Sequence, residues 1–373
     1  MPPGAVCIDL RGLDAVRVDP ATALVRVGGG ALLADLDRAT EEHGLAVPAG
    51  HVSHTGVGGL TLGGGVGWLM RAHGLTIDSL VEAEVVLADG AIVRASAEEH
   101  VDLFWALRGG GGDFGVVTEF TFRGRRVGPM VYGGMLLYPW THAREALRRG
   151  RELMEDAPEE LTTFVTLMTA PPGPPFPEAL QGGPAVAIGV AWAGAIADGE
   201  AALAPLRAAF PPALDLLGPL PYTALQKMID HTAQHGWGYA DRMHYTDEVG
   251  DELIDALVAG FERVPGPFSA INVGWMGGAV RAVAPGATAF GHRDAGALVW
   301  LIGCSGPEPA DGVRAWVRTL WEETAVHASG GVYVNALHDG RPVSDAYAAD
   351  VWARLTAVKR RYDPYGVFSG NGV

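Results

Sequence analysis

Cysteine and long apolar runs are scarce in this 373-residue sequence, and each scarcity excludes a class of protein. The two cysteines, Cys7 and Cys304, cannot form a disulfide framework, and the absence of a CxxC pair gives no indication of a zinc site. No apolar run reaches the roughly 18 residues that a membrane-spanning helix requires. The first ten residues lack the basic and apolar segments of a secretory signal, so we expect a cytoplasmic protein.

Positive charge is scarce as well. Lysine and arginine together number 27 against 43 acidic residues, which gives a formal net charge of −16. Such a chain repels phosphate backbones and anionic membranes, and no dense basic patch offsets this, so we expect neither nucleic acid nor membrane as a partner. With 48% hydrophobic residues the chain can build a sizeable core, and its length favours about two domains. The oligomeric state is not indicated.

Glycine, by contrast, is abundant, with 53 residues, and glycines cluster in two segments, 56–67 and 109–112. Consecutive glycines let backbone N–H groups approach a bound group closely, and a concave set of such groups suits a pyrophosphate. Neither segment is followed by G-K-[ST], and neither opens a Rossmann βαβ unit. Tight turns and close strand crossings are the alternative interpretation. The ligand hypothesis requires an open trench between the two segments, and residues 56–67 are too rich in glycine to predict a regular element.

The pattern along the chain predicts an α+β fold. Residues 15–30 and 81–96 read as β-hairpins around D-P-A-T and Asp89-Gly90, and residues 5–9 read as a strand. Residues 31–44 have helical spacing and end at a glycine. After residue 129, strands such as 161–169 and 297–305 alternate irregularly with helices, which favours an antiparallel sheet covered by helices.

Four strings then carry a resemblance. VPAGHVSHTGVGGLTLGGGVGWL, DLFWALRGGGGDFGVVT, YVNAL and VKRRYDPYGVFSGN resemble, in this order, the berberine bridge enzyme-like FAD-linked oxidases of the vanillyl-alcohol oxidase-type fold. The resemblance implies a two-part FAD-binding domain in residues 1–128 and a substrate-binding domain with an antiparallel sheet in residues 129–330. It also implies a C-terminal segment, residues 331–373, that returns to the FAD domain.

Within this resemblance, both glycine segments and their flanks would contact FAD, largely through main-chain groups. The implied cofactor-binding residues are Thr55, Gly56, Gly58, Gly59, Gly63, Gly64, Gly65, Gly67, Gly74, Asp78, Gly112, Gly115, Val117 and Asn371.

The sequence departs from the family at both covalent attachment points. The R-x-G-G-H-type phosphate loop is not found before Cys7, and Val52 stands where many members have the attaching cysteine. Any bound FAD is therefore expected to be non-covalent. The chain is either a shortened form of a normal flavoenzyme or a natural remnant that lost flavin binding, and the well-kept glycine segments favour the first.

The resemblance implies hydride removal from a small-molecule alcohol, amine or sugar-like C–H to flavin N5, with dioxygen as the expected acceptor and a place in specialised metabolism. The protein orients the substrate and supplies a base. Tyr333 and Asn335 match the family's Y-x-N strand at the substrate side of the flavin, although Ala336 replaces the aromatic residue that often follows. The alternative for Tyr333 is a structural role, with its ring in the core and its hydroxyl at the edge. A flavin-free remnant that binds a small molecule, or one that catalyses a cyclisation-type step, is the rival function.

Histidine and aromatic residues complete the candidate site. His51 and His54 flank the first glycine segment, but no third ligand accompanies them, so we predict no metal. Arg293 is expected in a structural salt bridge. The candidate substrate contacts are His51, Tyr239, His244 and Tyr245. Five tryptophans are expected to lie in the core because large aromatic side chains bury area first, and these are Trp68, Trp105, Trp192, Trp275 and Trp300.

Overall fold

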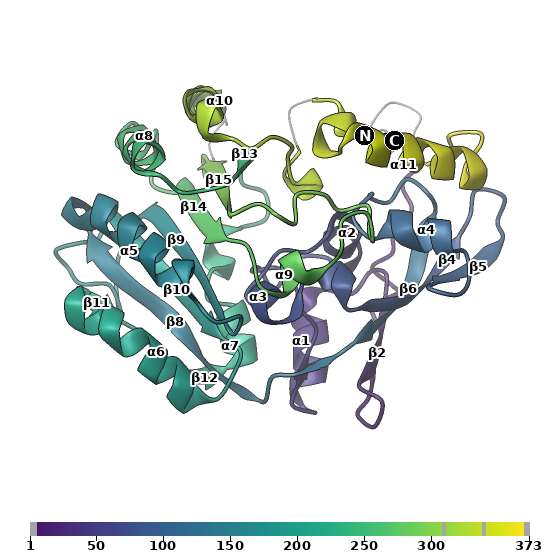
Figure 1. Ribbon diagram of the computed structural model, residues 1–373, viewed down its shortest axis with the longest axis horizontal. Helices are drawn as coiled ribbons and strands as arrows, with labels where there is room; N and C mark the ends of the chain where they lie inside the picture. The colour runs from purple at the N-terminus through teal and green to yellow at the C-terminus, as the bar shows by residue number, and fades with distance from the viewer. Residues whose placement is uncertain (1–5, 308–310, 338–340, 369–373) are drawn as a thin grey trace.

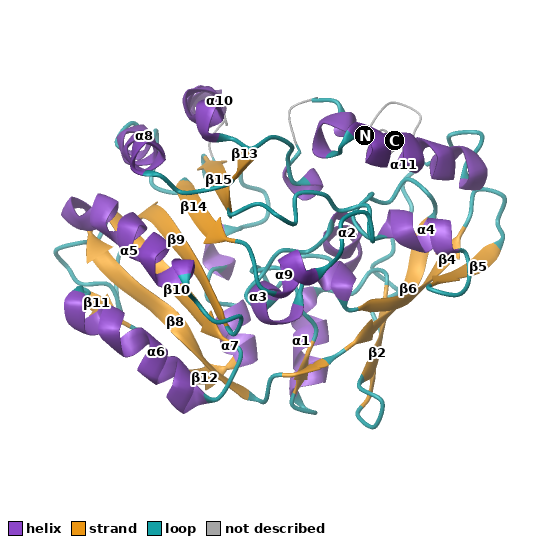
Figure 2. Cartoon of the chain, viewed as in Figure 1, coloured by secondary structure: helices purple, strands orange, loops and turns teal. Residues whose placement is uncertain are grey.

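Two β-sheets with their helices form the two halves of the molecule, side by side (Figure 1). The structure is a computed structural model that describes residues 6–307, 311–337 and 341–368. Figure 2 shows helices and strands mixed in both halves, which confirms the predicted α+β class. Within these described ranges, no helix combines the length and apolar composition needed to cross a membrane.

The first sheet is antiparallel and is built almost entirely from the first third of the chain. Its order is β1 (Val16–Asp19), β2 (Leu24–Gly28), β6 (Val116–Arg123), β4 (Leu80–Val86) and β5 (Ile92–Ser96). A two-stranded sheet pairs β3 (Leu45–Ala46) with β7 (Arg125–Arg126). The helices of this half are α1 (Leu33–Glu41), α2 (Val57–Gly63), α3 (Met70–His73), α4 (Val101–Leu107) and the C-terminal α11 (Ala349–Tyr362).

The second sheet is larger and also antiparallel. Its order is β11 (Leu214–Asp215), β8 (Met130–Pro139), β10 (Pro184–Trp192), β9 (Leu161–Thr169), β14 (Ala270–Trp275), β15 (Ala297–Cys304) and β13 (Tyr239–Thr246), and β12 (Gly218–Pro221) also pairs with β8. The helices of this half are α5 (Ala143–Glu155), α6 (Ile196–Ala209), α7 (Tyr222–Gln226), α8 (Asp251–Phe261), α9 (Ala279–Ala282) and α10 (Asp311–Thr324).

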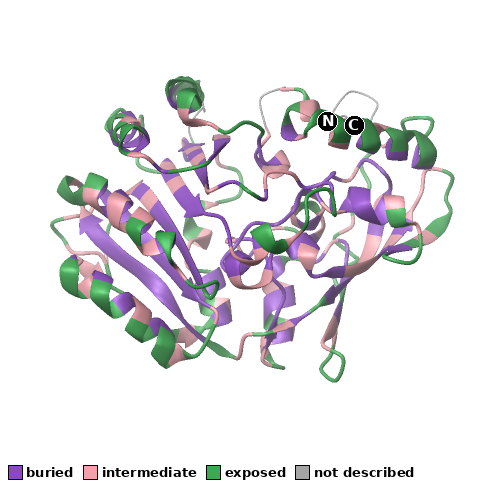
Figure 3. Ribbon diagram, in the orientation of Figure 1, coloured by how far each residue is buried: buried purple, intermediate pink, exposed green. Residues whose placement is uncertain are grey.

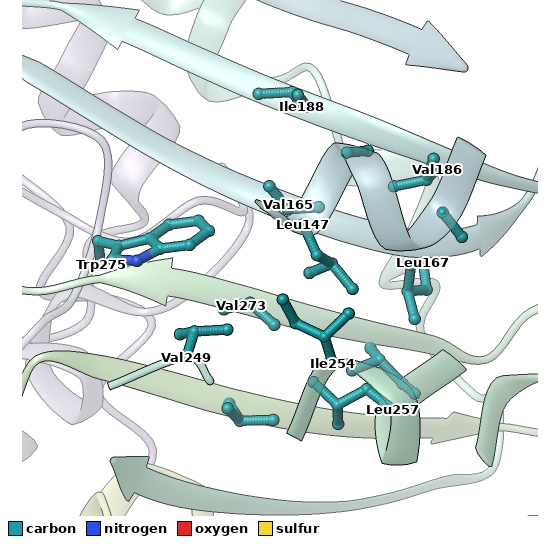
Figure 4. Close-up of a cluster of buried hydrophobic side chains, with 14 of the residues drawn as sticks. Leu147, Val165, Leu167, Val186, Ile188, Val249, Ile254, Leu257, Val273 and Trp275 are labelled. Atoms are coloured by element: carbon teal, nitrogen blue, oxygen red, sulfur yellow. The ribbon is translucent and has the colours of Figure 1, made fainter. Parts of the chain in front are cut away.

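One face of the large sheet packs against α5, α6, α8 and α10. Alternate strand residues such as Val165 and Val273 point to this side because the side-chain period of a strand is two. They meet Leu147 of α5 and Ile254 of α8 in the core drawn in Figure 4. The opposite face is thereby left to the first half of the molecule, and Figure 3 shows buried residues where the two halves meet.

Two arginines join the halves through buried contacts. Arg71 of α3 donates to the carbonyl oxygens of Leu161, Met276 and Ala157. Arg293 donates to both carboxylate oxygens of Asp78, at 3.0 and 2.8 Å. The second contact confirms the salt bridge predicted for Arg293. It also gives Asp78 a structural role.

Three local predictions fail for identifiable reasons. Residues 6–9 form no strand, because they make no β-ladder with a neighbouring strand among the described residues. Residues 57–63 form α2 despite their glycines, because packing against neighbouring segments stabilises a helix that the propensity of its residues does not favour. Gly58, for example, faces the carbonyl oxygen of Gly29, where a Cβ would not fit. Tyr333 is not in a strand, and the turn that follows it, η5 (Val334–Ala336), is a 3-10 helix.

Candidate functional site

The free face of the large sheet is ordered in rows by its hydrogen-bond register. One row crosses β9, β14, β15 and β13 through Phe164, Gly274, Leu298 and Tyr245. Phe164, Leu298 and Tyr245 are buried against the first half of the molecule, in the same cluster as Trp68. This row therefore forms the closed part of the face.

The next row is polar and half-buried. Thr166, Asn272 and Trp300 are partners across β9, β14 and β15. The Thr166 hydroxyl donates to the Asn272 side-chain oxygen at 2.6 Å, and the Trp300 indole N–H donates to Asp241 at 2.8 Å. The surface formed by Thr166, Asn272, Trp300 and Asp241 is called the polar row below. It presents hydrogen-bonding groups beside an indole ring, a combination suited to a small polar molecule.

Tyr333 lies where the polar row meets the first glycine segment. Its ring packs edge-on against Trp300, with the ring centroids 6.4 Å apart. Its hydroxyl oxygen accepts hydrogen bonds from the Gly65 N–H and from the Asn335 side-chain amide, both at 2.9 Å. Asn335 is fixed in turn by a bond from its amide to the Leu60 carbonyl oxygen. Tyr333 and Asn335 are thus brought together, as the motif predicts.

The environment of the Tyr333 hydroxyl has two opposing effects on its acidity. Burial raises the pKa of Tyr333, whereas the N–H donors from Gly65 and Asn335 lower it. Both donors point at the oxygen, and no carbonyl or carboxylate of the described residues accepts the phenol proton. A phenolate would use these donors fully, so they offset part of the cost of burial, and the net effect is a raised pKa of Tyr333.

The two glycine segments lie against each other, which corrects the expected trench. The N–H groups of Gly109 and Gly111 donate to the Leu62 carbonyl oxygen. A Cβ at Gly63 would overlap Asn335, one at Gly64 would lie 2.7 Å from Phe290, and the positions of most other glycines are equally filled. The void lined by Gly109 and Phe290 measures about 10 Å³, room for about one water. Most of these glycines therefore allow close contact between protein segments.

Three glycines remain open and test whether a pyrophosphate fits. A Cβ on Gly56 or Gly59 would meet nothing within 4 Å, and one on Gly112 would meet only Leu62 at 3.5 Å. Gly58 and Gly59 belong to the first turn of α2, whose N–H groups have no acceptor within the helix. Such donors, together with the helix dipole, suit an anion. The residues therefore fit a phosphate group along Gly56, Gly59 and Gly112.

The other predicted cofactor contacts are used by the protein itself. Thr55 pairs through its backbone with Val52 and Leu33. Gly74 approaches Asp78 closely, which its positive φ of 84° permits. A Cβ at Gly115 would overlap Val85, a Cβ at Gly65 would overlap Thr76, and one at Gly67 would overlap the Ala49 carbonyl; Val117 is buried in the first sheet. Asn371 lies outside the described residues.

The predicted substrate contacts divide between the two faces of the large sheet. His244 points to the helix side, where its Nε2 bonds to the Trp321 carbonyl oxygen and the Thr324 hydroxyl of α10. Tyr245 lies on the correct face but is buried and stacks on His292. Tyr239 is exposed, and its hydroxyl donates to backbone carbonyls of residues 232 and 234.

The two histidines beside the first glycine segment do not converge. The His51 ring packs against Trp68 and Phe164, and burial lowers the pKa of His51 to about 4. The His54 ring lies 4.6 Å from the ring of His235. Among the described residues, no three histidine, cysteine or acidic side chains gather as a metal would require.

Sequence reasoning missed the polar row. Trp300 was assigned to the core, whereas it is only half-buried and holds Asp241. Trp68, Trp105, Trp192 and Trp275 are buried as predicted. The available signal was the alternation in residues 161–169 and 297–304, which puts Thr166 and Trp300 on the face opposite the helix-covered residues.

The C-terminal segment contacts the second glycine segment. The Lys359 ammonium of α11 donates to the Asp113 carbonyl oxygen and to the Asp363 carboxylate. The Tyr347 hydroxyl donates to the Gly109 carbonyl oxygen. These bonds, together with the bond from Gly65 to Tyr333, hold described residues between positions 333 and 363 against the first half of the molecule.

Comparisons with known proteins agree with this architecture. Residues 2–96 match the family model described as an FAD binding domain. An FAD-linked oxidoreductase of Dictyostelium discoideum is 29% identical over 369 residues, which cover 98% of this chain and 78% of that protein. Among solved structures, the xylooligosaccharide oxidase of Myceliophthora thermophila in complex with xylobiose superposes with a TM-score of 0.82 at 24% identity, covering 98% of this chain and 80% of that one.

A plant protein carries the same fold. BBE-like 1 of Physcomitrella patens superposes with a TM-score of 0.82 at 23% identity, covering 96% of this chain and 79% of that one. The sequence match of the FAD-binding domain and the relatives that span nearly the whole chain agree with the open glycines at α2. The chain is therefore an FAD-linked oxidoreductase with FAD as its cofactor, and it has the vanillyl-alcohol-oxidase-type fold that berberine bridge enzyme-like proteins share.

Proposed function

We propose that the protein oxidises a hydroxyl-bearing small molecule that binds over the polar row, with Tyr333 as the proton acceptor. The observation that carries the proposal is the environment of the Tyr333 hydroxyl. Its oxygen accepts hydrogen bonds from the Gly65 N–H and the Asn335 side-chain amide, at the point where the first glycine segment meets the large sheet. When bound, FAD supplies the two-electron acceptor that no ordinary side chain provides. Gly56, Gly59 and Gly112 would hold its phosphate groups.

The polar row would orient the substrate. The Asn272 amide and the Thr166 hydroxyl offer hydrogen bonds to hydroxyl groups, and the Trp300 ring offers an apolar surface beside them. An alcohol or a sugar-like molecule suits this set, and the related xylooligosaccharide oxidase is named for a sugar substrate. An amine is the other substrate class, because the Asp241 carboxylate lies in the same row.

Tyr333 would take the hydroxyl proton as the C–H bond breaks. The bonds from Gly65 and Asn335 stabilise the phenolate form that accepts this proton and becomes a neutral phenol, while Trp300 and Phe290 pack against the ring and exclude water. Because burial raises the pKa of Tyr333, turnover should increase toward alkaline pH as the phenol ionises.

The first experiment asks whether the chain holds flavin. The purified protein is expected to be yellow and to release free FAD on denaturation, since Val52 offers no thiol for a covalent link. A protein that is colourless, and stays colourless with added FAD, would overturn the proposal. That outcome would favour a flavin-free binding protein, an alternative suggested by the filled positions at Gly63 and Gly64.

The second experiment tests Tyr333 itself. Tyr333→Phe should lower kcat by roughly 10²–10⁴-fold, the range of general base catalysis, with unchanged FAD content. Tyr347→Phe is the matched control, because its hydroxyl donates to Gly109 away from the polar row. The assay would measure dioxygen consumption with a panel of alcohols, sugars and amines. Equal turnover by the two variants, or an unchanged pH profile in Tyr333→Phe, would contradict the role of Tyr333.

A further inference from the structure

His292 has a backbone conformation that residues other than glycine seldom adopt. Its φ is 56°, in the left-handed region, and among the described residues only Ala23 and His100 share this property without being glycine. Histidine tolerates the left-handed region better than most residues, yet the conformation costs free energy and persists only where surrounding contacts impose it. Because such strain gathers at functional sites, the contacts of His292 indicate what it serves.

The His292 ring lies between the large sheet and the segment that leads to Tyr333. On one side it stacks on the Tyr245 ring of β13, with ring centroids 4.8 Å apart and an interplanar angle of 20°. On the other side it lies against Gly331, where an added Cβ would overlap the imidazole. Gly331 precedes Tyr333 by two residues, so the thickness of the His292 ring sets how closely this segment approaches the sheet.

The segment before Tyr333 is attached to both halves of the molecule. At its start, the Ser329 N–H donates to the Tyr245 carbonyl oxygen at 2.9 Å, so the second half holds it there. At its end, the Tyr333 hydroxyl accepts from the Gly65 N–H of the first half at 2.9 Å. Residues 328–333 form neither helix nor strand, and their position therefore depends on these contacts and on the packing of His292.

His292 acts at this place as an uncharged ring. Burial lowers the pKa of His292 below 6.5, while the carboxylate of the exposed Asp294 acts in the opposite direction. The stacked Tyr245 keeps its proton as well, because burial raises its pKa and Tyr333 raises it further, against an opposing effect of Arg293. At the alkaline pH at which Tyr333 ionises, His292 is neutral, and it influences Tyr333 through packing rather than through charge.

We propose that His292 is a positioning residue for Tyr333, whose ring fixes the segment that brings the Tyr333 hydroxyl to the Gly65 N–H. The inference rests on the proposed function of Tyr333 as the proton acceptor. Without the ring, the segment can move into the space left behind, and the N–H donors reach the Tyr333 oxygen less well. Because these donors lower the pKa of Tyr333, weakening them should raise that pKa, and turnover should then require a higher pH.

The test compares His292→Gly with His100→Gly in the full chain with FAD bound. Glycine removes the ring but adopts a positive φ without strain, so the backbone conformation can be kept. His100 is the matched control, because its φ is 46° and its ring also contacts a tyrosine, Tyr362. None of its hydrogen bonds or ring contacts within the described part of the chain reaches residues 329–333.

Three measurements follow Tyr333 and its segment. Ultraviolet absorbance records tyrosine ionisation in a pH titration, and the difference between each protein and its Tyr333→Phe counterpart isolates Tyr333. Amide hydrogen exchange reports how firmly residues 329–333 are held. Dioxygen consumption, with whichever alcohol, sugar or amine the wild type oxidises fastest, gives kcat and KM.

In His292→Gly the ionisation of Tyr333 should move upward by about one pH unit or more, which corresponds to weakening one hydrogen bond to a charged group. At fixed neutral pH, kcat should then fall about tenfold with KM unchanged, and residues 329–333 should exchange faster. Added imidazole should reverse these changes, because the half-buried ring leaves a space that it can refill. His100→Gly should show none of these effects.

Unchanged ionisation and exchange in His292→Gly, or equal changes in both variants, would overturn the inference. A change that imidazole does not reverse would assign the effect to the backbone and would also contradict it. If His292→Gly fails to fold, His292→Asn takes its place, since asparagine also tolerates a positive φ. Retained turnover in Tyr333→Phe would refute the proposed oxidation alone, because ionisation and exchange report the positioning without turnover.

Discussion

Replacing Asp78 with asparagine should destabilise the protein strongly without acting on the cofactor. Asp78 and Arg293 are 9% and 7% exposed, and both carboxylate oxygens accept from the guanidinium. Asparagine retains the shape but removes the charge, so it leaves the Arg293 cation buried without its counter-ion. Breaking a buried pair in this way costs about 3–5 kcal/mol.

Urea unfolding followed by tryptophan fluorescence would measure this loss. Asp255→Asn is the matched control, because Asp255 pairs with Arg144 at 2.6 Å but is exposed, and an exposed pair contributes about 0–1 kcal/mol. The double variant Asp78→Asn with Arg293→Gln should lose less than Asp78→Asn alone, since no lone buried charge remains. The reasoning would be refuted if Asp78→Asn were as stable as the control yet lost FAD, because Asp78 would then serve the cofactor as first expected.

Two further predictions concern the contact between the halves and the response to acid. Arg71→Met should lower the free energy of unfolding by about 3 kcal/mol or more in urea titrations, because buried carbonyl oxygens of the second half lose their charged donor. Arg94→Met is the control, because Arg94 is exposed. Equal losses of stability in the two variants would contradict the role of Arg71. Because burial lowers the folded-state pKa of His51 from 6.5 to about 4, the unfolded chain binds the proton more tightly, so stability is complete above pH 6.5 and falls as the pH drops toward 4. His51→Phe should flatten the melting temperature measured across that pH range, and an unchanged slope would show that His51 does not carry it.

Local patterns were enough to predict most regular elements. The D-P-A-T turn between β1 and β2 and the Asp89-Gly90 turn between β4 and β5 are encoded within a few residues, so both hairpins were confirmed. Helix α2 was not predictable, since glycine has poor helix propensity and only packing against the Gly29 carbonyl explains it. The pairing of Tyr333 with Asn335 was indicated by their motif, whereas the bond from Gly65 joins residues 268 positions apart.

The sequence by itself determined the α+β class, the resemblance to FAD-linked oxidases and the identity of the glycine segments, because these depend on composition and on local order. Tertiary structure alone decided which glycines face protein and which stay open, because that depends on what other segments place beside each Cα. It also decided that His244 faces the helices while Trp300 faces the site: in a sheet, register assigns each residue to a face, and register is set by partners distant in the chain.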